Sequence, residues 1–289
     1  MIPSIEYFRP NNLNELLTLL NKYQNDTKVL AGGTDVITGL FQELSRFKRI
    51  KILLDLNQIP EIKGIKKKNG NIVIGAASTL LDIINNSLVK EYFPLITKAA
   101  SGIGSVQIRN RATMTGNFVN NAPCADSVPA LLVYNAIIKL QSIEQHREIL
   151  LKDFLRRPYQ TRINPDEVVT EIQLPILSKN YIGDFYKLGR RRSVSISRIT
   201  LAVLMQIQDS IIKDIRIASG AVTPIGKRFA ELEKYACGKK ISEKLYKELS
   251  QKIGKQILEQ TGLRWSSAYK LPVVQQMFFQ LLQKIHNSI

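Results

Sequence analysis

Apolar positions near the start of the chain alternate between helical spacing and short continuous runs. Leucines recur three and four residues apart between residues 13 and 20, which predicts an amphipathic helix. The run Lys28–Ala31 predicts a short buried strand, Val36–Leu44 predicts a second helix, and Ile50–Leu54 predicts a second strand. This alternation is typical of a compact β-α-β lobe, which we expect over residues 1–57.

A second pattern of mixed helices and strands follows up to about residue 178. Apolar runs at Ile62–Ile65 and Ile72–Gly75 flank Asn69-Gly70, a pair typical of hairpin turns, so we expect an antiparallel hairpin. Five further elements are expected: helices over Thr79–Asn85 and Phe93–Ala100, a short helix capped by Asp126 or Ser127, and strands at Ala136–Leu140 and Glu167–Leu174. Pro175 and the polar residues after it mark a boundary near residue 178.

Beyond this boundary the pattern predicts a smaller C-terminal domain, residues 179–289. Its long apolar runs at Arg198–Gln208 and Ile211–Ser219 are separated only by Asp209-Ser210, which predicts an antiparallel hairpin. Three helical segments follow, beginning near Lys227, Ser242 and Ser267. The last of them carries an apolar stripe that predicts packing in the core, formed by Leu271, Val274, Phe278, Leu281 and Leu282.

Composition favours a globular protein and argues against membrane-spanning and secreted proteins. The 289 residues, 44% of them hydrophobic, can bury two cores. No stretch reaches the roughly 18 uninterrupted apolar residues of a membrane helix, and the N-terminal residues lack the pattern of a signal peptide, so we expect a cytoplasmic protein. Cys124 and Cys237, the only cysteines, are too few for four thiolate ligands, so any iron–sulfur cluster must lie in a partner.

The formal net charge of +17 raises the possibility of nucleic-acid binding, because clustered cations release counterions from phosphates. The basic runs Lys66–Lys68, Arg190–Arg192 and Lys239-Lys240 are short and dispersed, and no aromatic residues are interleaved with them. Solvated faces therefore explain the charge better. Part of the charge can also meet an acidic partner subunit or an anionic dinucleotide.

Two glycine-bearing segments about 80 residues apart are the main candidates for a functional site. They are Leu30–Asp35, which reads LAGGTD, and Arg109–Asn117, which reads RNRATMTGN. Each joins a small-residue turn, whose N–H groups can point at an anion, to a threonine hydroxyl that can donate another hydrogen bond to phosphate. The first segment alone is also a common start of a helix, but the pair is typical of a cradle for a flavin dinucleotide.

From end to end, the chain resembles the FAD-binding (medium) subunits of the xanthine dehydrogenase and molybdenum hydroxylase family. The segments that carry the resemblance are Val29–Val36, Gln107–Asn110 with Thr113, Gly116, Asn117, Pro123, Asp126 and Pro129, then Tyr186-Lys187, Ala221–Pro224 and Arg264–Tyr269. This resemblance implies an α+β fold. A two-lobed FAD-binding domain of the vanillyl-alcohol-oxidase (PCMH) type would occupy residues 1–178, with lobes at about 1–57 and 58–178. A smaller α+β domain of the CO dehydrogenase flavoprotein type, an antiparallel sheet plus helices, would follow.

The resemblance also implies a set of FAD-binding residues. They are Lys28, Val29, Leu30, Ala31, Gly32, Gly33, Thr34 and Asp35 around the pyrophosphate, Ala112, Thr113, Met114, Thr115, Gly116 and Asn117 on its other side, and Asp126, Val168 and Lys187. Asp35 should turn away from phosphate toward backbone donors. Asn117 and Asp126 should accept hydrogen bonds from ribose or support the loop. Lys187 should bring positive charge near the reduced flavin, and Val168 should contact it.

One position departs from the family pattern, in which two adjacent glycines precede the asparagine of the second segment. Here Thr115 replaces the first of them. If the position requires a positive φ, threonine costs on the order of 1 kcal/mol there.

His146 and His286 should be surface residues, because neither has a second ligand at metal spacing. Neither lies in the first flavin segment, where a covalent linkage would be expected, so FAD should be bound noncovalently.

The resemblance implies electron transfer by an oxidoreductase subunit, with no catalytic residue or metal ligand in this chain. Electrons would leave a substrate at molybdopterin in a large subunit, pass through [2Fe–2S] clusters in a small subunit, and reach FAD here, which then reduces NAD or another acceptor. A stand-alone FAD-dependent oxidase or reductase of the same fold is the alternative, and a non-enzymatic nucleic-acid-binding protein the third hypothesis. The substrate (purine, nicotinate or aldehyde), the acceptor and the oligomeric state stay open.

Overall fold

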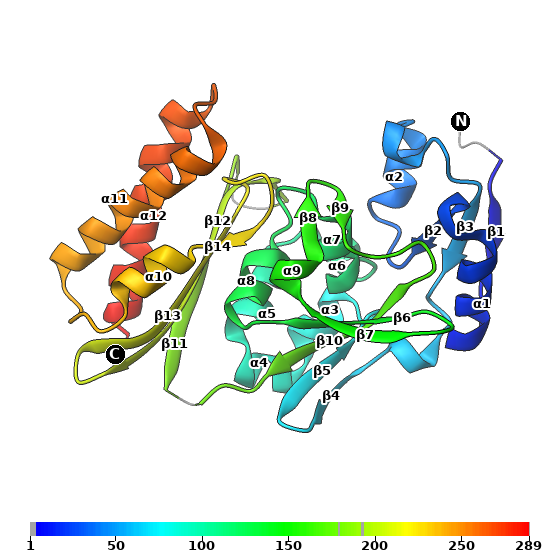
Figure 1. Ribbon diagram of the computed structural model, residues 1–289, viewed down its shortest axis with the longest axis horizontal. Coiled ribbons are helices and arrows are strands. Elements are labelled where there is room, and N and C mark those ends of the chain that lie inside the picture. The colour runs from blue at the N-terminus through cyan, green and yellow to red at the C-terminus, as the bar shows by residue number, and fades with distance from the viewer. Residues whose placement is uncertain (1–3, 179, 192–193, 289) are drawn as a thin grey trace.

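The computed structural model describes residues 4–178, 180–191 and 194–288. Lys179, at the expected boundary, and Arg192, in the expected basic run, lie outside these residues. Figure 1 shows an elongated arrangement in which a small sheet at the N-terminal end, a central group of strands and helices, and a C-terminal sheet with its helices follow one another in space. The mixed α+β class expected from the sequence is confirmed.

A three-stranded parallel sheet forms the N-terminal part. Its strands lie in the order β1 (Glu6–Phe8), β3 (Ile52–Asp55) and β2 (Thr27–Leu30), with helices α1 (Leu13–Tyr23) and α2 (Val36–Phe41) in the connections. The predicted β-α-β alternation is confirmed. Helix α2 ends three residues before the predicted Leu44, because Glu43 adopts a positive φ of 52° that a helix cannot continue through.

A five-stranded antiparallel sheet forms the centre. Its strands lie in the order β4 (Ile65–Lys68), β5 (Asn71–Gly75), β10 (Val168–Pro175), β6 (Ile137–Gln141) and β7 (His146–Leu150). The predicted hairpin at Asn69-Gly70 is present, but its first strand was placed wrongly. Ile62 ends a 3₁₀ turn, and Gly64, at a φ of 85°, separates that turn from the strand, which consists mostly of the lysine run.

Short helices cover this central sheet. They are α3 (Leu80–Asn85), α4 (Ser87–Tyr92), α5 (Pro94–Ser101), α6 (Val106–Arg109), α7 (Met114–Asn120), α8 (Ser127–Val133) and α9 (Leu151–Phe154), followed by the small hairpin of β8 (Leu155–Arg157) and β9 (Gln160–Thr161). Every residue of α8 is buried, so its apolar run has no solvent face. Figure 1 shows α8 between the central sheet and the C-terminal sheet.

The C-terminal part is a four-stranded antiparallel sheet with three helices on one face (Figure 1). The elements are β11 (Tyr181–Gly189), β12 (Ser197–Gln208), β13 (Ile211–Gly220), β14 (Lys227–Arg228), α10 (Ala230–Ala236), α11 (Glu243–Thr261) and α12 (Ser267–His286). The predicted hairpin is confirmed, and Asp209 and Ser210 both have positive φ, as its tight turn requires. The first of the three predicted helices begins only at Ala230, because the residues before it pair as β14.

Strand β12 connects the two large cores. Ala202 and Leu204 belong to the central core, while Leu201 and Val203, which point the other way, belong to the core beneath α11 and α12. The stripe predicted on α12 is confirmed as core, since Val274, Phe278, Leu281 and Leu282 are buried there. No helix of the described residues is long and apolar enough to cross a membrane.

Candidate functional site

The two glycine-bearing segments, about 80 residues apart in the sequence, touch in the structure. The first segment follows β2, and a Cβ built on Gly32 would lie 2.2 Å from the carbonyl oxygen of Arg111 and 2.7 Å from Cα of Ala112. No larger residue allows this approach, because the atoms it would meet are backbone. Gly33 has a φ of 73°, a conformation that glycine adopts without strain. The fold therefore brings together the two segments that the sequence had singled out.

The first segment presents three consecutive backbone N–H groups without protein partners. Within the described residues, the N–H groups of Gly32, Gly33 and Thr34 make no hydrogen bond. The carbonyls of the same turn are used, since Gly33 accepts from the N–H of Ile37 at 3.0 Å and Thr34 accepts from the hydroxyl of Thr38 at 3.0 Å. A turn with paired carbonyls and unpaired N–H groups is suited to binding an anion.

A buried aspartate at the end of β3 fixes the start of this segment. Asp55 accepts hydrogen bonds from the hydroxyl of Tyr7 and, at 2.8 Å, from the backbone N–H of Asn57. The side chain of Asn57 in turn donates to the carbonyl of Ala31 at 2.9 Å. Sequence reasoning missed this support for the glycine turn. The feature of the sequence that could have indicated it is Asp55 at the end of an apolar strand, followed two residues later by the amide side chain of Asn57.

The second segment is the start of a helix, where the sequence had suggested a loop. Thr113 is the N-cap of α7, and its hydroxyl accepts from the N–H of Gly116 at 2.9 Å. Thr115 lies in the first turn of that helix and has no positive φ, so the strain considered for this position is absent. Its hydroxyl oxygen is buried without a hydrogen-bond partner among the described residues. An unpaired buried hydroxyl is costly unless a ligand satisfies it.

Asn117 and Asp126 are both engaged with protein groups. The Asn117 side-chain oxygen accepts from the N–H of Ser127 at 3.3 Å and from its hydroxyl at 2.6 Å, so it supports the connection from α7 to α8. Asp126 accepts from Nζ of Lys187 at 2.7 Å and from the hydroxyl of Ser197. Burial raises the pKa of Asp126, and Lys187 and Ser197 only partly oppose that rise. A hydrogen bond of either side chain to ribose stays a prediction.

Lys187 ties β11 to the central part of the molecule. Besides its ion pair with Asp126, its ammonium group donates to the carbonyl of Gly102 at 2.7 Å, at the end of α5. The lysine is therefore fixed next to the connection that follows the second segment. Its proximity to a bound flavin, like that of Val168, stays a prediction. Val168 is buried at the start of β10 in the same core cluster as Ala112.

The expectation for Asp35 was wrong. Its carboxylate forms an ion pair with Arg46 at 2.8 Å and makes no capping hydrogen bond to the backbone of α2. The Arg46 guanidinium also lies 4.3 Å from the ring centroid of Tyr159, in the turn between β8 and β9, and its Nε atom is buried without a partner. Asp35 pairs with Arg46 in place of backbone donors, because Arg46 extends back toward it from the 3₁₀ turn that follows α2.

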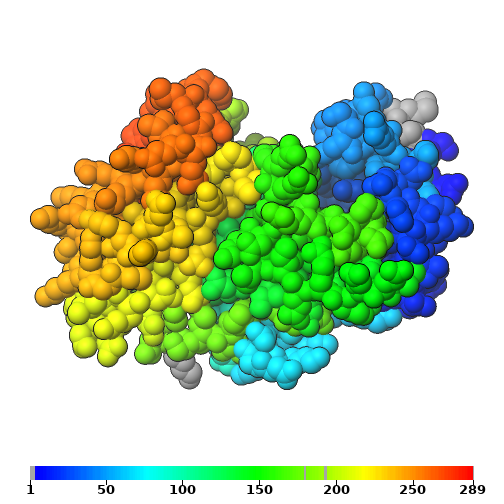
Figure 2. Space-filling model, in the orientation of Figure 1, coloured from blue at the N-terminus to red at the C-terminus, as the bar shows by residue number. Residues whose placement is uncertain are grey.

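Lys28 adds a second cation beside Asp35. Burial, together with the like charge of Arg46, lowers the pKa of the Lys28 ammonium group, while Asp35 opposes that change. Arg46 was absent from the residues expected at the site, although it lies in the basic segment that follows the second predicted helix. Figure 2 shows the surface hollowed between the light-blue α2 region and the green turn of β8 and β9, the two places that Arg46 connects.

The remaining candidates have structural explanations. Burial raises the pKa of the Cys124 thiol, with Asp126 adding to the rise, so this cysteine is no reactive thiolate. His146 is exposed, as expected, whereas His286 is half-buried with its ring edge-on to Tyr246. No group of three or more metal-ligating side chains occurs in the part of the chain that the structure describes.

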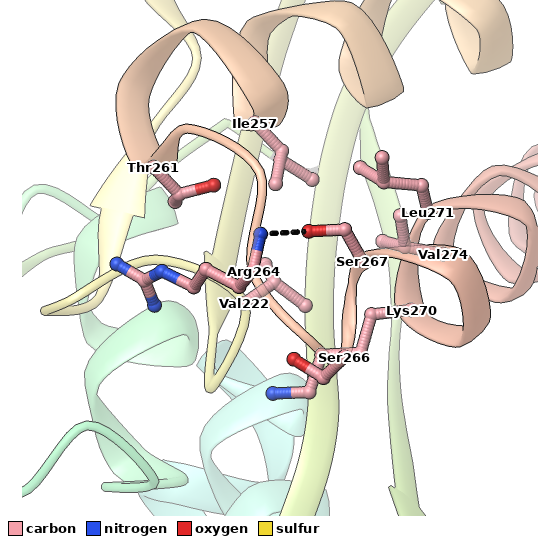
Figure 3. Close-up of a pocket in the computed structure, with 9 residues that line it drawn as sticks. All are labelled: Val222, Ile257, Thr261, Arg264, Ser266, Ser267, Lys270, Leu271 and Val274. Atoms are coloured by element: carbon pink, nitrogen blue, oxygen red, sulfur yellow. Dashed lines mark hydrogen bonds between the residues drawn. The ribbon is translucent and has the colours of Figure 1, made fainter.

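A cavity of about 20 Å³ lies between the ends of α11 and α12, far along the chain from both glycine segments. Figure 3 shows that it is lined by apolar side chains such as Val274 and by the polar residues of the α11–α12 connection, and that the N–H of Arg264 donates to the hydroxyl of Ser267. This volume holds no more than a water molecule. It is therefore not a site for an organic substrate.

Comparison with known proteins finds relatives that match this chain over nearly its whole length. Residues 3–177 match the family model described as the FAD binding domain in molybdopterin dehydrogenase, and residues 184–285 match that of the CO dehydrogenase flavoprotein C-terminal domain. The glyceraldehyde dehydrogenase medium chain of Sulfolobus acidocaldarius is 31% identical, over 98% of this chain and 99% of its own length. The xanthine dehydrogenase FAD-binding subunit of Escherichia coli O157:H7 is 28% identical, over 96% of this chain and 94% of its own.

A solved structure of carbon monoxide dehydrogenase from Hydrogenophaga pseudoflava contains a chain with the same fold. The two chains superpose with a TM-score of 0.92 at 26% sequence identity, and 99% of each is covered. The expected resemblance is thereby confirmed. The chain belongs to the family of FAD-binding medium subunits of molybdenum hydroxylase-type dehydrogenases, and it is an oxidoreductase subunit.

Proposed function

We propose that this chain binds FAD noncovalently between its two glycine segments and relays electrons through it. The electrons come from [2Fe–2S] clusters in a small partner subunit, which receives them from a molybdopterin-containing large subunit, and they leave for NAD or another acceptor. The names of its relatives support this assignment, because they describe medium chains and FAD-binding subunits of dehydrogenases. With only two cysteines, the chain itself cannot ligate such clusters.

The observation that carries the proposal is the contact of Gly32 with the backbone of Arg111 and Ala112. It joins a turn with three unpaired N–H groups to the helix start that carries the unpaired hydroxyl of Thr115. The N–H groups fit the oxygens of a pyrophosphate, and the Thr115 hydroxyl fits a further polar atom of the dinucleotide. The buried hydroxyl of Thr115 costs free energy without a partner, and the N–H groups belong to partly exposed residues that a ligand can reach, so both features support a ligand-binding role.

The cofactor supplies the redox chemistry when bound, and the residues of this chain bind and orient it. Residues 28–35 and 112–117 are the proposed contact segments. Arg46 and Lys28 bring positive charge beside the first segment, and one net positive charge remains after Asp35 is counted, which attracts the negatively charged pyrophosphate. The ion pair of Asp126 and Lys187 fixes the position of β11 against the second segment. Val168 contributes an apolar contact surface for the flavin.

A stand-alone flavoenzyme of this fold would need a cavity for its own organic substrate. The cavity of about 20 Å³ in the C-terminal part is too small, and the larger open hollow of about 470 Å³ beside Gly64, Leu81 and Asn85 is lined by no residue of the two glycine segments. The charged side chains around the glycine segments are also paired within the protein, as in Asp35 with Arg46 and Asp126 with Lys187. These pairs favour a binding role over acid–base catalysis.

The absorption spectrum of the purified chain tests the proposal. We expect absorption bands at about 370 and 450 nm. After acid precipitation the chromophore should be found in the supernatant as FAD, since a noncovalent flavin is released when the protein unfolds. A flavin that stays with the precipitate would contradict noncovalent binding. A colourless chain that also fails to take up added FAD would refute the proposed function.

A further inference from the structure

The three most exposed large apolar side chains of the described residues lie in the α11–α12 connection and just before β12. Trp265 and Leu263, in the connection between α11 and α12, are 90% and 85% exposed, and Ile196, just before β12, is 78% exposed. Large apolar side chains at such exposure lose free energy in water, and a tryptophan loses most. A cluster of them on a folded chain marks a surface that another molecule covers.

Positive charge surrounds these side chains. The pKa of Lys270 is lowered by burial first and then by the like charges of Arg198 and Arg264, which places the two arginines close to it from β12 and from the α11–α12 connection. None of the ion pairs among the described residues includes Arg198, Arg264 or Lys270. We call this surface the Trp265 patch, formed by Ile196, Arg198, Leu263, Arg264, Trp265 and Tyr269.

The patch is built on an ordered base. The N–H of Arg264 donates to the hydroxyl of Ser267 at 2.9 Å, which fixes the turn into α12 (Figure 3). Lys270, one turn further on, donates to the carbonyl of Ala221 at 2.7 Å, and the N–H of Ala221 donates to the carbonyl of Pro123 at 2.8 Å. These bonds connect the patch to the segment that precedes Asp126. Leu263 and Trp265 are therefore presented by a connection held by hydrogen bonds, which lowers the entropy cost of binding.

We propose that the Trp265 patch docks a partner subunit of the complex, on an acidic surface with an apolar pocket that receives the indole of Trp265. The proposal rests on the proposed function, in which this chain works as one subunit of a larger enzyme. Tryptophan and arginine are the residues that contribute most often to protein–protein affinity. Uncompensated arginines around an apolar centre fit a surface of opposite charge, which both attracts and orients it.

Two other occupants fit the patch less well. A second copy of this chain would bring the same arginines against one another, and such like charges oppose association. A lipid surface is bound most often through one long amphipathic helix, whereas here the apolar side chains come from two short loops. Both alternatives are outcomes of the experiment below.

The experiment uses the fact that Trp265 is the only tryptophan of the chain. The chain is labelled with 5-fluorotryptophan and mixed with its unlabelled [2Fe–2S] and molybdopterin subunits, so that a single fluorine resonance reports on the patch. We expect this resonance to shift and to become insensitive to solvent exchange from H₂O to D₂O when the complex forms. A stable complex that leaves the resonance unchanged overturns the proposal.

Variants of the full-length chain measure the contribution of the patch. Trp265→Ala and Arg264→Glu should each weaken assembly at least about tenfold, because both residue types dominate such interfaces. The matched control is Ile143→Ala, which removes an exposed apolar side chain from the turn between β6 and β7. It should change the dissociation constant by less than about twofold. A loss equal to that of Trp265→Ala in the control would contradict the proposal.

The flavin content of each variant keeps this test separate from the proposed function. Trp265→Ala should retain FAD and the melting temperature of the parent chain, because the indole is exposed. A parent chain that binds no FAD would refute the proposed function, whereas the fluorine signal reports docking in either case. A resonance that responds to phosphatidylserine vesicles, or to rising concentration of this chain alone, and does not respond to the partner subunits would overturn the docking proposal.

Discussion

Gly32 is the residue at which the two cofactor segments meet, so its replacement tests their contact directly. Gly32→Ala places a methyl group 2.2 Å from the carbonyl oxygen of Arg111, and neither backbone can give way without separating the segments. We expect loss of FAD and a decrease of about 1–3 kcal/mol in the free energy of unfolding. The ratio of flavin to protein after gel filtration and a urea titration measure the two effects.

Gly102→Ala is the matched control. The added methyl group would meet Ala99 and the Lys187 side chain at 3.4 and 3.5 Å, which is ordinary contact, and Gly102 has a negative φ. This variant should keep its flavin and its stability to within about 0.5 kcal/mol. Equal losses in the two variants would show that any alanine near the site is harmful, and would remove the special role of Gly32.

Thr115 allows a test in which stability and binding change in opposite directions. Thr115→Val preserves the shape of the side chain and removes a buried hydroxyl that has no partner among the described residues. The chain without FAD should become more stable by up to about 1 kcal/mol, while the affinity for FAD decreases. Melting curves without and with added FAD check both signs. A hydroxyl that contributes nothing to FAD would leave the affinity unchanged.

At this scale, the sequence indicates the residues that could act through their own chemistry. The glycines and threonines of the two segments stand out because their backbone freedom and hydroxyl groups are local properties, and their contact with FAD stays a prediction. Asp55 and Arg46 were missed because their roles come from partners distant in the sequence, Tyr7 for the aspartate and Tyr159 for the arginine. Such partners become visible only after the chain has folded.

At the scale of elements, Asp184 connects three of them. Its carboxylate, on β11, pairs with Lys98 on α5 and with Lys284 on α12 at 2.7 Å. Burial would raise the pKa of Asp184, but the hydrogen bonds from Lys284, Lys98 and a backbone N–H outweigh it and hold the pKa below its usual value. The ion pairs therefore stabilise the docking of α5 and α12 on β11.

The lowered pKa fixes the direction of a pH dependence. The stabilisation is present above the unfolded pKa of an aspartate, about 4, and is lost as the pH falls through the still lower folded value. Asp184→Asn should therefore reduce the free energy of unfolding by about 1–3 kcal/mol at neutral pH and by less under acid conditions. Urea titrations across this range measure the difference. As a control, Glu259→Gln, which removes an exposed pair with Lys255, should change little at any pH.

The elements with strong periodicity were predicted well, and the others were not. The hairpin of β12 and β13 and the helices α11 and α12 carry long apolar patterns. Strand β1 and strand β7 were missed, because β1 has only three residues and β7 has no buried one. The strand expected at residues 62–65 was misplaced, because buried Ile62 reads as strand although it ends a 3₁₀ turn.

At the scale of the whole molecule, the C-terminal sheet lies between two hydrophobic cores. One face of β12 packs on the central part with its glycine segments, and the other face packs on α11 and α12. The loop of the Trp265 patch is thus linked to the cofactor segments through a rigid sheet and through Lys270 and Ala221. Under the proposed function, this link joins the proposed docking patch to the segments that would bind FAD.

The same reasoning predicts how the isolated chain behaves. Loaded with FAD and kept free of oxygen, it should show no loss of absorbance at about 450 nm when mixed with xanthine, nicotinate or glyceraldehyde, because under the proposed function these substrates are oxidised at molybdopterin in a partner subunit. Dithionite should remove this band completely, which controls for a flavin that can be reduced. Addition of the [2Fe–2S] and molybdopterin subunits should then allow one of the substrates to remove it. Reduction by a substrate with this chain alone would support a stand-alone flavoenzyme, since the electrons would have reached FAD without passing through a partner.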